Sequence, residues 1–201
     1  CSLADIQVYC GGKNVYGELG INNSGTYFTT PQYVSANLSD KGVTSVSAGG
    51  ALDGTTGQPF TCMIANGQSF CTGENANGQL GIGNTTRQWI PMPLTQSAGA
   101  LGDGVETSIS TGRLNGCAIA NGRVSCWGYN PNGSTGSSNS PIAISTAVMS
   151  GWATQVAAGH SYSCAIADGK VYCWGLNSSG QLGTGNSTNQ PNPYDVSTPT
   201  A

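Results

Sequence analysis

Cysteines are the residues of this sequence whose number and spacing most directly indicate a chemistry. Eight residues separate the two members of each of four pairs: Cys1 and Cys10, Cys62 and Cys71, Cys117 and Cys126, Cys164 and Cys173. Three pairs are centred on Asn66-Gly67, Asn121-Gly122 and Asp168-Gly169. Such dipeptides favour two-residue type I′ hairpin turns, which place the cysteines opposite each other at a non-hydrogen-bonded site, with Cα atoms about 4.5 Å apart. We therefore predict four cross-strand disulfides. The fourth turn, Asp5-Ile6, fits this geometry poorly.

Reduced core cysteines or metal ligands are the alternative interpretation of these pairs. A zinc site usually needs closer pairs such as C-x2-C, often with histidines, and His160 is the only histidine of the chain. Disulfides are the preferred reading, and four of them imply an oxidising compartment. We therefore expect a secreted, periplasmic or surface-displayed protein, extracellular or on the cell surface, with no metal site and no cofactor.

Catalytic residues are not indicated by any local pattern. The chain has nine carboxylates, one histidine and, with all cysteines paired, no free thiol. His160 precedes a predicted hairpin, where a packed or capping role is favoured over a catalytic one. Asp103 lies in an Asp-Gly turn, and the spacing of the acidic residues does not indicate a calcium site. We expect the protein not to be an enzyme.

Charge and hydropathy exclude two classes of partner. Charged residues make up 7% of the chain and the formal net charge is −3, so no basic surface is expected for nucleic acid. No apolar run approaches the eighteen or so residues needed to cross a membrane, and we expect no membrane insertion. The sequence begins at Cys1, which indicates a mature, trimmed or partial chain. A lipid anchor on Cys1 is the minor alternative, because Cys10 would then lose its partner.

The cysteine hairpins belong to a longer repeat. Each is followed by a glycine-rich segment, such as "GENANGQLGIGNTT" or "GLNSSGQLGTGNST", and then by a proline with a short apolar pair. Three are preceded by a strand-like piece: "GVTSVSAGG", "GVETSISTG" and "WATQVAAGH". Short strands with turns at this period indicate an all-β protein, a β-propeller or propeller arc of four repeats. The units of this single repeat domain (1–201) run roughly over 1–41, which lacks its first strand, 42–103, 104–151 and 152–201.

Residues 164–191, "CAIADGKVYCWGLNSSGQLGTGNSTNQP", resemble the repeat of the regulator of chromosome condensation family, especially its secreted, cysteine-paired bacterial versions. The resemblance implies a β-propeller, commonly of seven blades. The nucleotide exchange and chromatin attachment known in the family are not carried over, because an acidic, disulfide-linked protein belongs outside the nucleus. A secreted relative of the same fold inhibits β-lactamases, which makes a secreted protein inhibitor one alternative function.

Repeated residues have structural roles, whereas departures from the repeat are candidates for binding. Gly180, Gly183 and Gly185 match Gly78, Gly81 and Gly83 and fit tight turns. We expect the tryptophans and leucines of the repeat to pack between blades or in the core: Trp127, Trp174, Leu19, Leu80 and Leu182. The stretch "ALDGTTGQPF" (51–60) contains an insertion of eight residues relative to the other units and is the first candidate contact loop. The candidate binding residues are Asp53 and Phe60 in this stretch, Arg87 and Trp89, and the aromatic residues Tyr27, Phe28 and Tyr129.

The predicted function is that of a non-enzymatic extracellular interaction or adhesion module, with a protein or surface-glycan partner. The incomplete first unit supports two further interpretations. The chain is either part of a longer repeat protein, or it takes a strand from another copy of itself. The second case would make it a structural subunit of a filament or pilus-like assembly joined by strand complementation.

Overall fold

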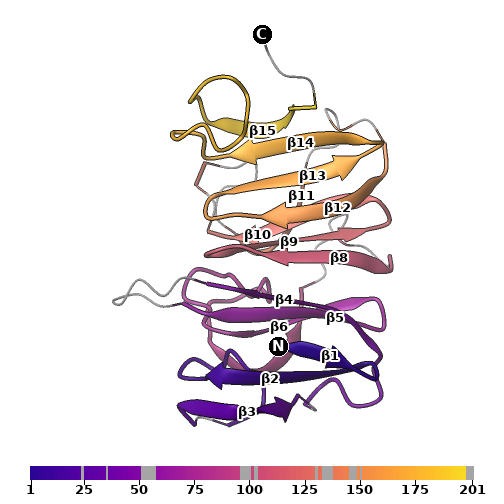
Figure 1. Ribbon diagram of the computed structural model, residues 1–201, viewed down its shortest axis with the longest axis vertical. Helices are drawn as coiled ribbons and strands as arrows, with labels where there is room; N and C mark the ends of the chain where they lie inside the picture. The colour runs from indigo at the N-terminus through magenta and orange to yellow at the C-terminus, as the bar shows by residue number, and fades with distance from the viewer. Residues whose placement is uncertain are drawn as a thin grey trace.

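The computed structural model describes residues 1–23, 25–34, 36–50, 58–95, 101, 104–129, 131–132, 138–144, 149 and 151–197. Over these residues the chain forms fifteen β-strands in four antiparallel sheets, which we call blades 1 to 4 (Figure 1). The blades are stacked in chain order along the long axis, from blade 1 at the N-terminus to blade 4. This part of the chain contains no helix long and apolar enough to span a membrane.

Each blade consists of strands that follow one another in the chain. Blade 1 contains β1 (Ser2–Ala4), β2 (Gln7–Lys13) and β3 (Tyr27–Tyr33). Blade 2 contains β4 (Val43–Gly49), β5 (Phe60–Ala65), β6 (Gln68–Gly73) and β7 (Gln88–Pro93). Blade 3 contains β8 (Glu106–Thr111), β9 (Asn115–Ala120), β10 (Arg123–Gly128) and β11 (Ser138–Ala143). Blade 4 contains β12 (Ala153–Ala158), β13 (Tyr162–Ala167), β14 (Lys170–Gly175) and β15 (Gln190–Asp195). The predicted all-β repeat architecture is confirmed as a propeller arc.

All four predicted disulfides are formed. The register pairs Cys62 with Cys71, Cys117 with Cys126 and Cys164 with Cys173 directly across the ladder. Their Cα atoms lie 4.1 Å apart, and those of Cys1 and Cys10 lie 4.0 Å apart. The turns have positive φ at both central residues, as type I′ requires.

The hairpin of blade 1 adopts the same turn in spite of its unfavourable residues. Asp5 has φ of 48° and Ile6 has φ of 61°, close to the 48° and 72° of Asn66 and Gly67. Ile6 therefore has a left-handed backbone that a β-branched residue rarely adopts. Ile6 is 67% exposed, and its Cδ1 atom lies 3.9 Å from the position where a Cβ on Gly42 would be. The bulky residue of this turn therefore lies beside a glycine of blade 2.

The two faces of each blade have distinct roles. We call the face that meets the next blade in the chain the forward face, and the opposite one the back face. The forward faces of blades 1, 2 and 3 carry the disulfides and apolar residues such as Val8, Ile64 and Val124. They pack on the back faces of blades 2, 3 and 4, on residues such as Phe70 and Tyr172. The core is therefore a series of three inter-blade layers; two of them bury a whole disulfide, and the layer between blades 1 and 2 buries Cys10 but leaves Cys1 exposed.

Candidate functional site

The glycine-rich segments of blades 1, 2 and 4 are each held by one asparagine. Asn75 accepts a hydrogen bond from the Leu80 amide at 3.0 Å and donates to the carbonyl oxygens of Asn84 (2.9 Å) and Thr86 (3.0 Å). In blade 4, Asn177 makes the same three kinds of bond, and in blade 1 Asn14 accepts from the Leu19 amide. These asparagines are completely or almost completely buried. Sequence reasoning assigned the glycines to turns but missed the asparagine, although it recurs at the same position of the repeat.

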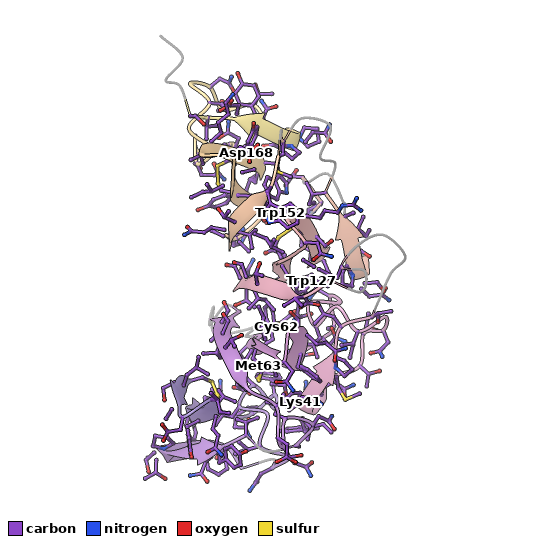
Figure 2. All side chains as sticks on the ribbon, turned by 90° about the vertical axis from the view of Figure 1, so that its right-hand side faces the viewer. Lys41, Cys62, Met63, Trp127, Trp152 and Asp168 are labelled. Carbon is purple, nitrogen blue, oxygen red and sulfur yellow. A yellow bond between two sulfur atoms is a disulfide. The ribbon has the colours of Figure 1, made fainter. Side chains whose placement is uncertain are left out.

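The glycines of these segments receive the next blade. A Cβ on Gly78 would lie 2.6 Å from the Asn139 Cα atom, and a Cβ on Gly81 would lie 2.8 Å from the Trp127 ring. Trp127 also donates from Nε1 to the carbonyl oxygen of Gln79 at 2.9 Å. Trp127 therefore packs between blades 2 and 3, as predicted, and lies near the middle of the arc (Figure 2). Trp174 and the three leucines are buried too, which confirms their assignment to the core.

Two of the candidate binding residues contribute to one surface where blades 1 and 2 meet. Arg87 makes an ion pair with Glu74, with Nε and Nη2 3.0 and 2.5 Å from Oε2. The Arg87 guanidinium lies 4.7 Å from the ring centre of Tyr16, and the Lys13 ammonium lies 6.0 Å from the same ring. Tyr27 is opposite Lys13 in the β2–β3 pair and is 70% exposed. We call this surface the Tyr16 cluster; its members are Lys13, Tyr16, Tyr27, Glu74 and Arg87.

Trp89 lies next to the Tyr16 cluster, but its contacts belong to the interface between blades 1 and 2. A Cβ on Gly17 would lie 3.0 Å from both Cα and the ring of Trp89, and the Asn22 amide donates to its carbonyl oxygen at 3.0 Å. Phe28 is half-buried against the layer between blades 1 and 2. Sequence reasoning found Tyr27 and Arg87 by residue type, but it missed Tyr16, whose ring lies against Lys13 and Arg87, because this residue belongs to the glycine-rich segment.

The other candidates lie elsewhere. Phe60 is fully buried at the first position of β5, so its side chain offers no surface to a partner. The reason is its place in the layer that joins blades 2 and 3. Asp53 and most of the insertion lie outside the described residues. Tyr129 is 41% exposed and lines an open depression with Asn77 and Asn139, which no member of the Tyr16 cluster lines.

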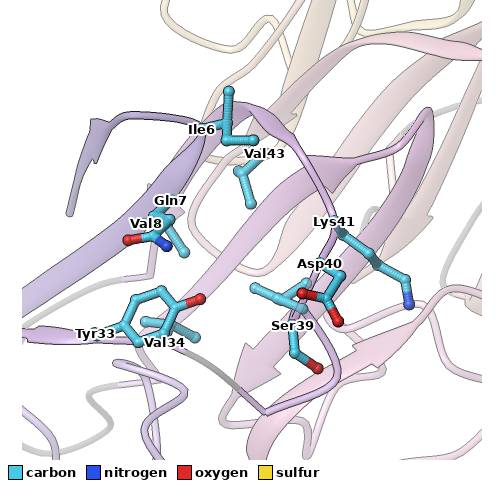
Figure 3. A pocket seen from close by; sticks show the side chains of 10 residues that line it. Ile6, Gln7, Val8, Tyr33, Val34, Ser39, Asp40, Lys41 and Val43 are labelled. Atoms are coloured by element: carbon cyan, nitrogen blue, oxygen red, sulfur yellow. The ribbon is translucent and has the colours of Figure 1, made fainter.

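A cavity of about 230 Å³ opens beside the first hairpin (Figure 3). It is lined by residues 6–8, by Tyr33 and Val34 at the end of β3, and by the connection that follows, including Asp40. The ammonium of Lys41 lies 5.2 Å from the ring centre of Phe70 and donates to the Asn37 carbonyl oxygen at 3.2 Å. The Lys41 ammonium beside this cavity is therefore already engaged in contacts within the protein. Sequence reasoning missed the cavity because it joins segments that carry no common motif.

The titratable groups within the described ranges are engaged in separate local contacts and are not brought together at one site. His160 is exposed, its Nε2 lies 2.8 Å from Arg113 and its Nδ1 lies 3.1 Å from the Ser161 hydroxyl. Burial raises the pKa of Glu106, which accepts a hydrogen bond from Ser69 across the blade 2–3 interface. The hydrogen bond from Lys170 lowers the pKa of Asp195 to about 2. Across the described ranges, no three His, Cys, Asp or Glu side chains are grouped so that they could hold a metal ion.

Comparison with known proteins identifies the repeat. The sequence profile of the Regulator of chromosome condensation (RCC1) repeat matches residues 7–52, 66–113 and 168–201, and a second RCC1 profile matches residues 153–181. Human WBSCR16 is similar in structure, with a TM-score of 0.79 and 23% identity, over 96% of this chain and 49% of its own. Prp20p from Saccharomyces cerevisiae, a protein that binds Gsp1p and histones, gives a TM-score of 0.68 and 16% identity, over 94% of this chain and 46% of its own.

These identities are low, so the two structures support the fold alone. The chain spans about half the length of either protein. The profile matches together cover well over half of the chain and include parts of all four blades, although in blade 3 they reach only β8. The chain therefore belongs to the family of proteins built from regulator of chromosome condensation (RCC1) repeats.

Proposed function

We propose that this chain is a non-enzymatic, extracellular protein-interaction module that binds a partner through the Tyr16 cluster. The observation that carries the proposal is the combination, on one exposed rim, of Tyr27 with the two cations that flank Tyr16. Tyrosine and arginine are the residue types that contribute most to binding at protein interfaces.

The geometry of the cluster favours a preformed contact surface. Arg87 is held by its ion pair with the nearly buried Glu74 and by the ring of Tyr16, so little side-chain freedom remains to be lost on binding. Its side chain is still 39% exposed. Two carboxylates balance the two cations: Glu74, and Glu18, whose Oε2 accepts a hydrogen bond from the Tyr16 amide at 2.7 Å. Both carboxylates are buried, so the charge that the rim presents to a partner is positive. A protein surface with a carboxylate next to an apolar patch would complement this rim.

The extracellular part of the proposal rests on the four disulfides. Each closes a short hairpin, and such bonds persist in oxidising compartments. Thiol titration of the protein isolated from its native source under acid quench tests this part, with an expected value of no free thiol. Eight free thiols in folded protein would overturn it.

Site-specific photo-crosslinking tests the binding surface. A benzophenone amino acid replaces Tyr27 in one preparation and Ile142, a residue on the outer strand of blade 3 with 39% exposure, in the other. Both preparations are applied to intact cells of the source. We expect a discrete crosslinked product from position 27 only, and its loss when Lys13→Glu is added. Equal products at both positions, or a product that Lys13→Glu leaves unchanged, would refute the Tyr16 cluster as the binding surface.

A further inference from the structure

The forward face of blade 4 is built like the three forward faces that the next blade covers. In blade 3 this face consists of Cys117, Ile119, Val124 and Cys126, none more than 1% exposed. The matching residues of blade 4 are Cys164, Ile166, Val171 and Cys173. Here Val171 is 36% exposed, Cys164 and Ile166 are only half-buried, and together they line an apolar groove that also includes Gln155 and Ala157 on β12.

The glycine-rich segment of blade 4 is likewise not covered by another blade. Gly78 and Gly81 of blade 2 are buried beneath blade 3, and Gly17 of blade 1 is buried beneath blade 2. Gly180 and Gly183 match Gly78 and Gly81 and share their positive φ, yet no described atom lies within 4 Å of a Cβ built on either. Asn177 nevertheless holds this segment by the bonds that Asn75 makes in blade 2. The surface that elsewhere receives a blade is therefore formed and empty.

The back face of blade 1 carries the matching half of this contact. The back faces of blades 2 and 4 place two small or flexible residues and one aromatic residue against the preceding blade: Met63, Ala65 and Phe70 in blade 2, and Ala165, Ala167 and Tyr172 in blade 4. In blade 3 the aromatic position is held by Ser125. Ser2, Ala4 and Tyr9 occupy the same three positions of blade 1. Tyr172 is 2% exposed, whereas Tyr9 is half-buried, with its ring centre 5.5 Å from that of Tyr33, and the two small residues are exposed.

The outer strand of blade 1, β3, resembles the outer strand of blade 2, which packs on the glycines of the preceding blade. Pro31 of β3 matches Pro91 of β7, whose ring lies 3.3 Å from the position of a Cβ on Gly20. Gly11 occupies the place of Trp127, so no side chain of blade 1 would collide with an opposing Gly183. One chain thus contains both halves of an inter-blade contact, and neither half is covered by the described residues.

We propose that copies of this 201-residue chain associate head to tail, with the forward face of blade 4 packed on the back face of blade 1 of the next copy. The contact would repeat the layers that join blades 1 to 4 within the chain, with Tyr9 against the groove beside Val171 and β3 over Gly180 and Gly183. Such a contact joins two different surfaces, so it is heterologous and leaves one face free at each end of an open dimer.

Two variants that each block one face test the proposal. Val171→Glu places a charge in the groove of blade 4, and Tyr9→Glu does so on the back face of blade 1. Ile142→Glu is the matched control, because Ile142 lies on the outer strand of blade 3 and is 39% exposed, close to the 36% of Val171. Far-ultraviolet circular dichroism and a thiol count establish that every variant is folded with its disulfides intact.

Light scattering then gives the molar mass of each protein from about 1 µM to about 1 mM. We expect the mass of the unmodified chain and of Ile142→Glu to rise with concentration from that of one chain, 20.3 kDa. Each blocked variant alone should stay at that mass. An equimolar mixture of Val171→Glu and Tyr9→Glu should form dimers and nothing larger, because it retains one intact pair of faces. A chain that is monomeric throughout, or blocked variants that still associate alone, would overturn the proposal. A mixture that stays monomeric would also overturn it, because the two faces would then not bind each other.

Discussion

Ile6, in the turn of blade 1, lies beside Gly42, which precedes the first strand of blade 2. In the two blades that follow, the glycine is in the turn and the larger residue precedes the next blade. In blade 2 a glycine lies in the turn and Val105 packs on it, with Cγ1 2.9 Å from a Cβ built on Gly67. In blade 3, the ring of Trp152 covers Gly122 in the same way. In blade 1 the bulky residue is in the turn and the glycine is its neighbour. Each pair therefore combines one large and one minimal side chain, and the sequence of the turn alone could not reveal it.

The reversed arrangement in blade 1 predicts the effect of replacing Ile6. Its left-handed backbone costs about 1 to 2 kcal/mol for an L-residue, and its 67% exposure means that little apolar burial compensates. We expect Ile6→Gly to raise the free energy of unfolding by about 1 kcal/mol, measured by chemical denaturation. Gly67→Ile in blade 2 should lower it by more than that, because Val105 already fills the space. A lower stability of Ile6→Gly would show that its cover of Gly42 outweighs the strain.

Glu106 predicts a pH dependence at the interface of blades 2 and 3. Because burial raises its pKa above 4.5, the folded chain retains this proton to a higher pH than the unfolded chain. The stabilisation from this group is therefore complete below pH 4.5 and is lost as the pH rises through the raised pKa. Glu106→Gln removes the titration and retains hydrogen-bonding capacity toward Ser69. We expect its melting temperature to exceed that of the unmodified chain by a few degrees at pH 7 and to converge with it near pH 4. A variant that is less stable at pH 7 would contradict this expectation.

At the scale of elements, the sequence predicts what depends on neighbours along the chain. The two-residue turns and the cysteine spacing determine the hairpin register, so the disulfides followed directly from the sequence. The glycine-rich segments were recognised only as turns, because the bonds of Asn75 link groups up to eleven residues away. The Tyr16 cluster was missed for a related reason. Arg87 and Tyr16 meet only when blade 2 packs on blade 1.

Asn75 makes the glycine-rich segment of blade 2 a testable element. Its side chain is fully buried and satisfies one amide and two carbonyl groups of the backbone. We expect Asn75→Ala to lower the free energy of unfolding by about 3 kcal/mol, roughly 1 kcal/mol for each bond. Asn192→Ala, on the exposed part of β15, is the control and should change it by less than about 0.5 kcal/mol. Equal effects at the two positions, measured by denaturant titration, would show that the segment does not depend on its asparagine.

At the scale of the whole molecule, the blades differ in how well their disulfides are covered. The bonds of blades 2 and 3 are enclosed between two sheets, and their four sulfur-bearing residues are at most 1% exposed: Cys62, Cys71, Cys117 and Cys126. In blade 1 Cys1 is exposed, and in blade 4 Cys164 is only half-buried. Position in the arc, and not the local hairpin, therefore sets the accessibility of each bond.

This difference predicts the order in which a mild reductant acts on the folded chain. Thiol–disulfide exchange requires access to a sulfur atom, so the bonds of blades 1 and 4 should be reduced at least ten times faster than the other two. Quenching with an alkylating agent at successive times, followed by peptide mass mapping, measures all four bonds in one sample. Reduction of all four bonds at one rate would instead mean that the reductant reaches them only after global unfolding.

Repeating the measurement at high protein concentration distinguishes the disulfide of blade 1 from that of blade 4. Head-to-tail association would cover Cys164 and slow its reduction, whereas it would leave Cys1, which is on the forward face of blade 1, at its original rate.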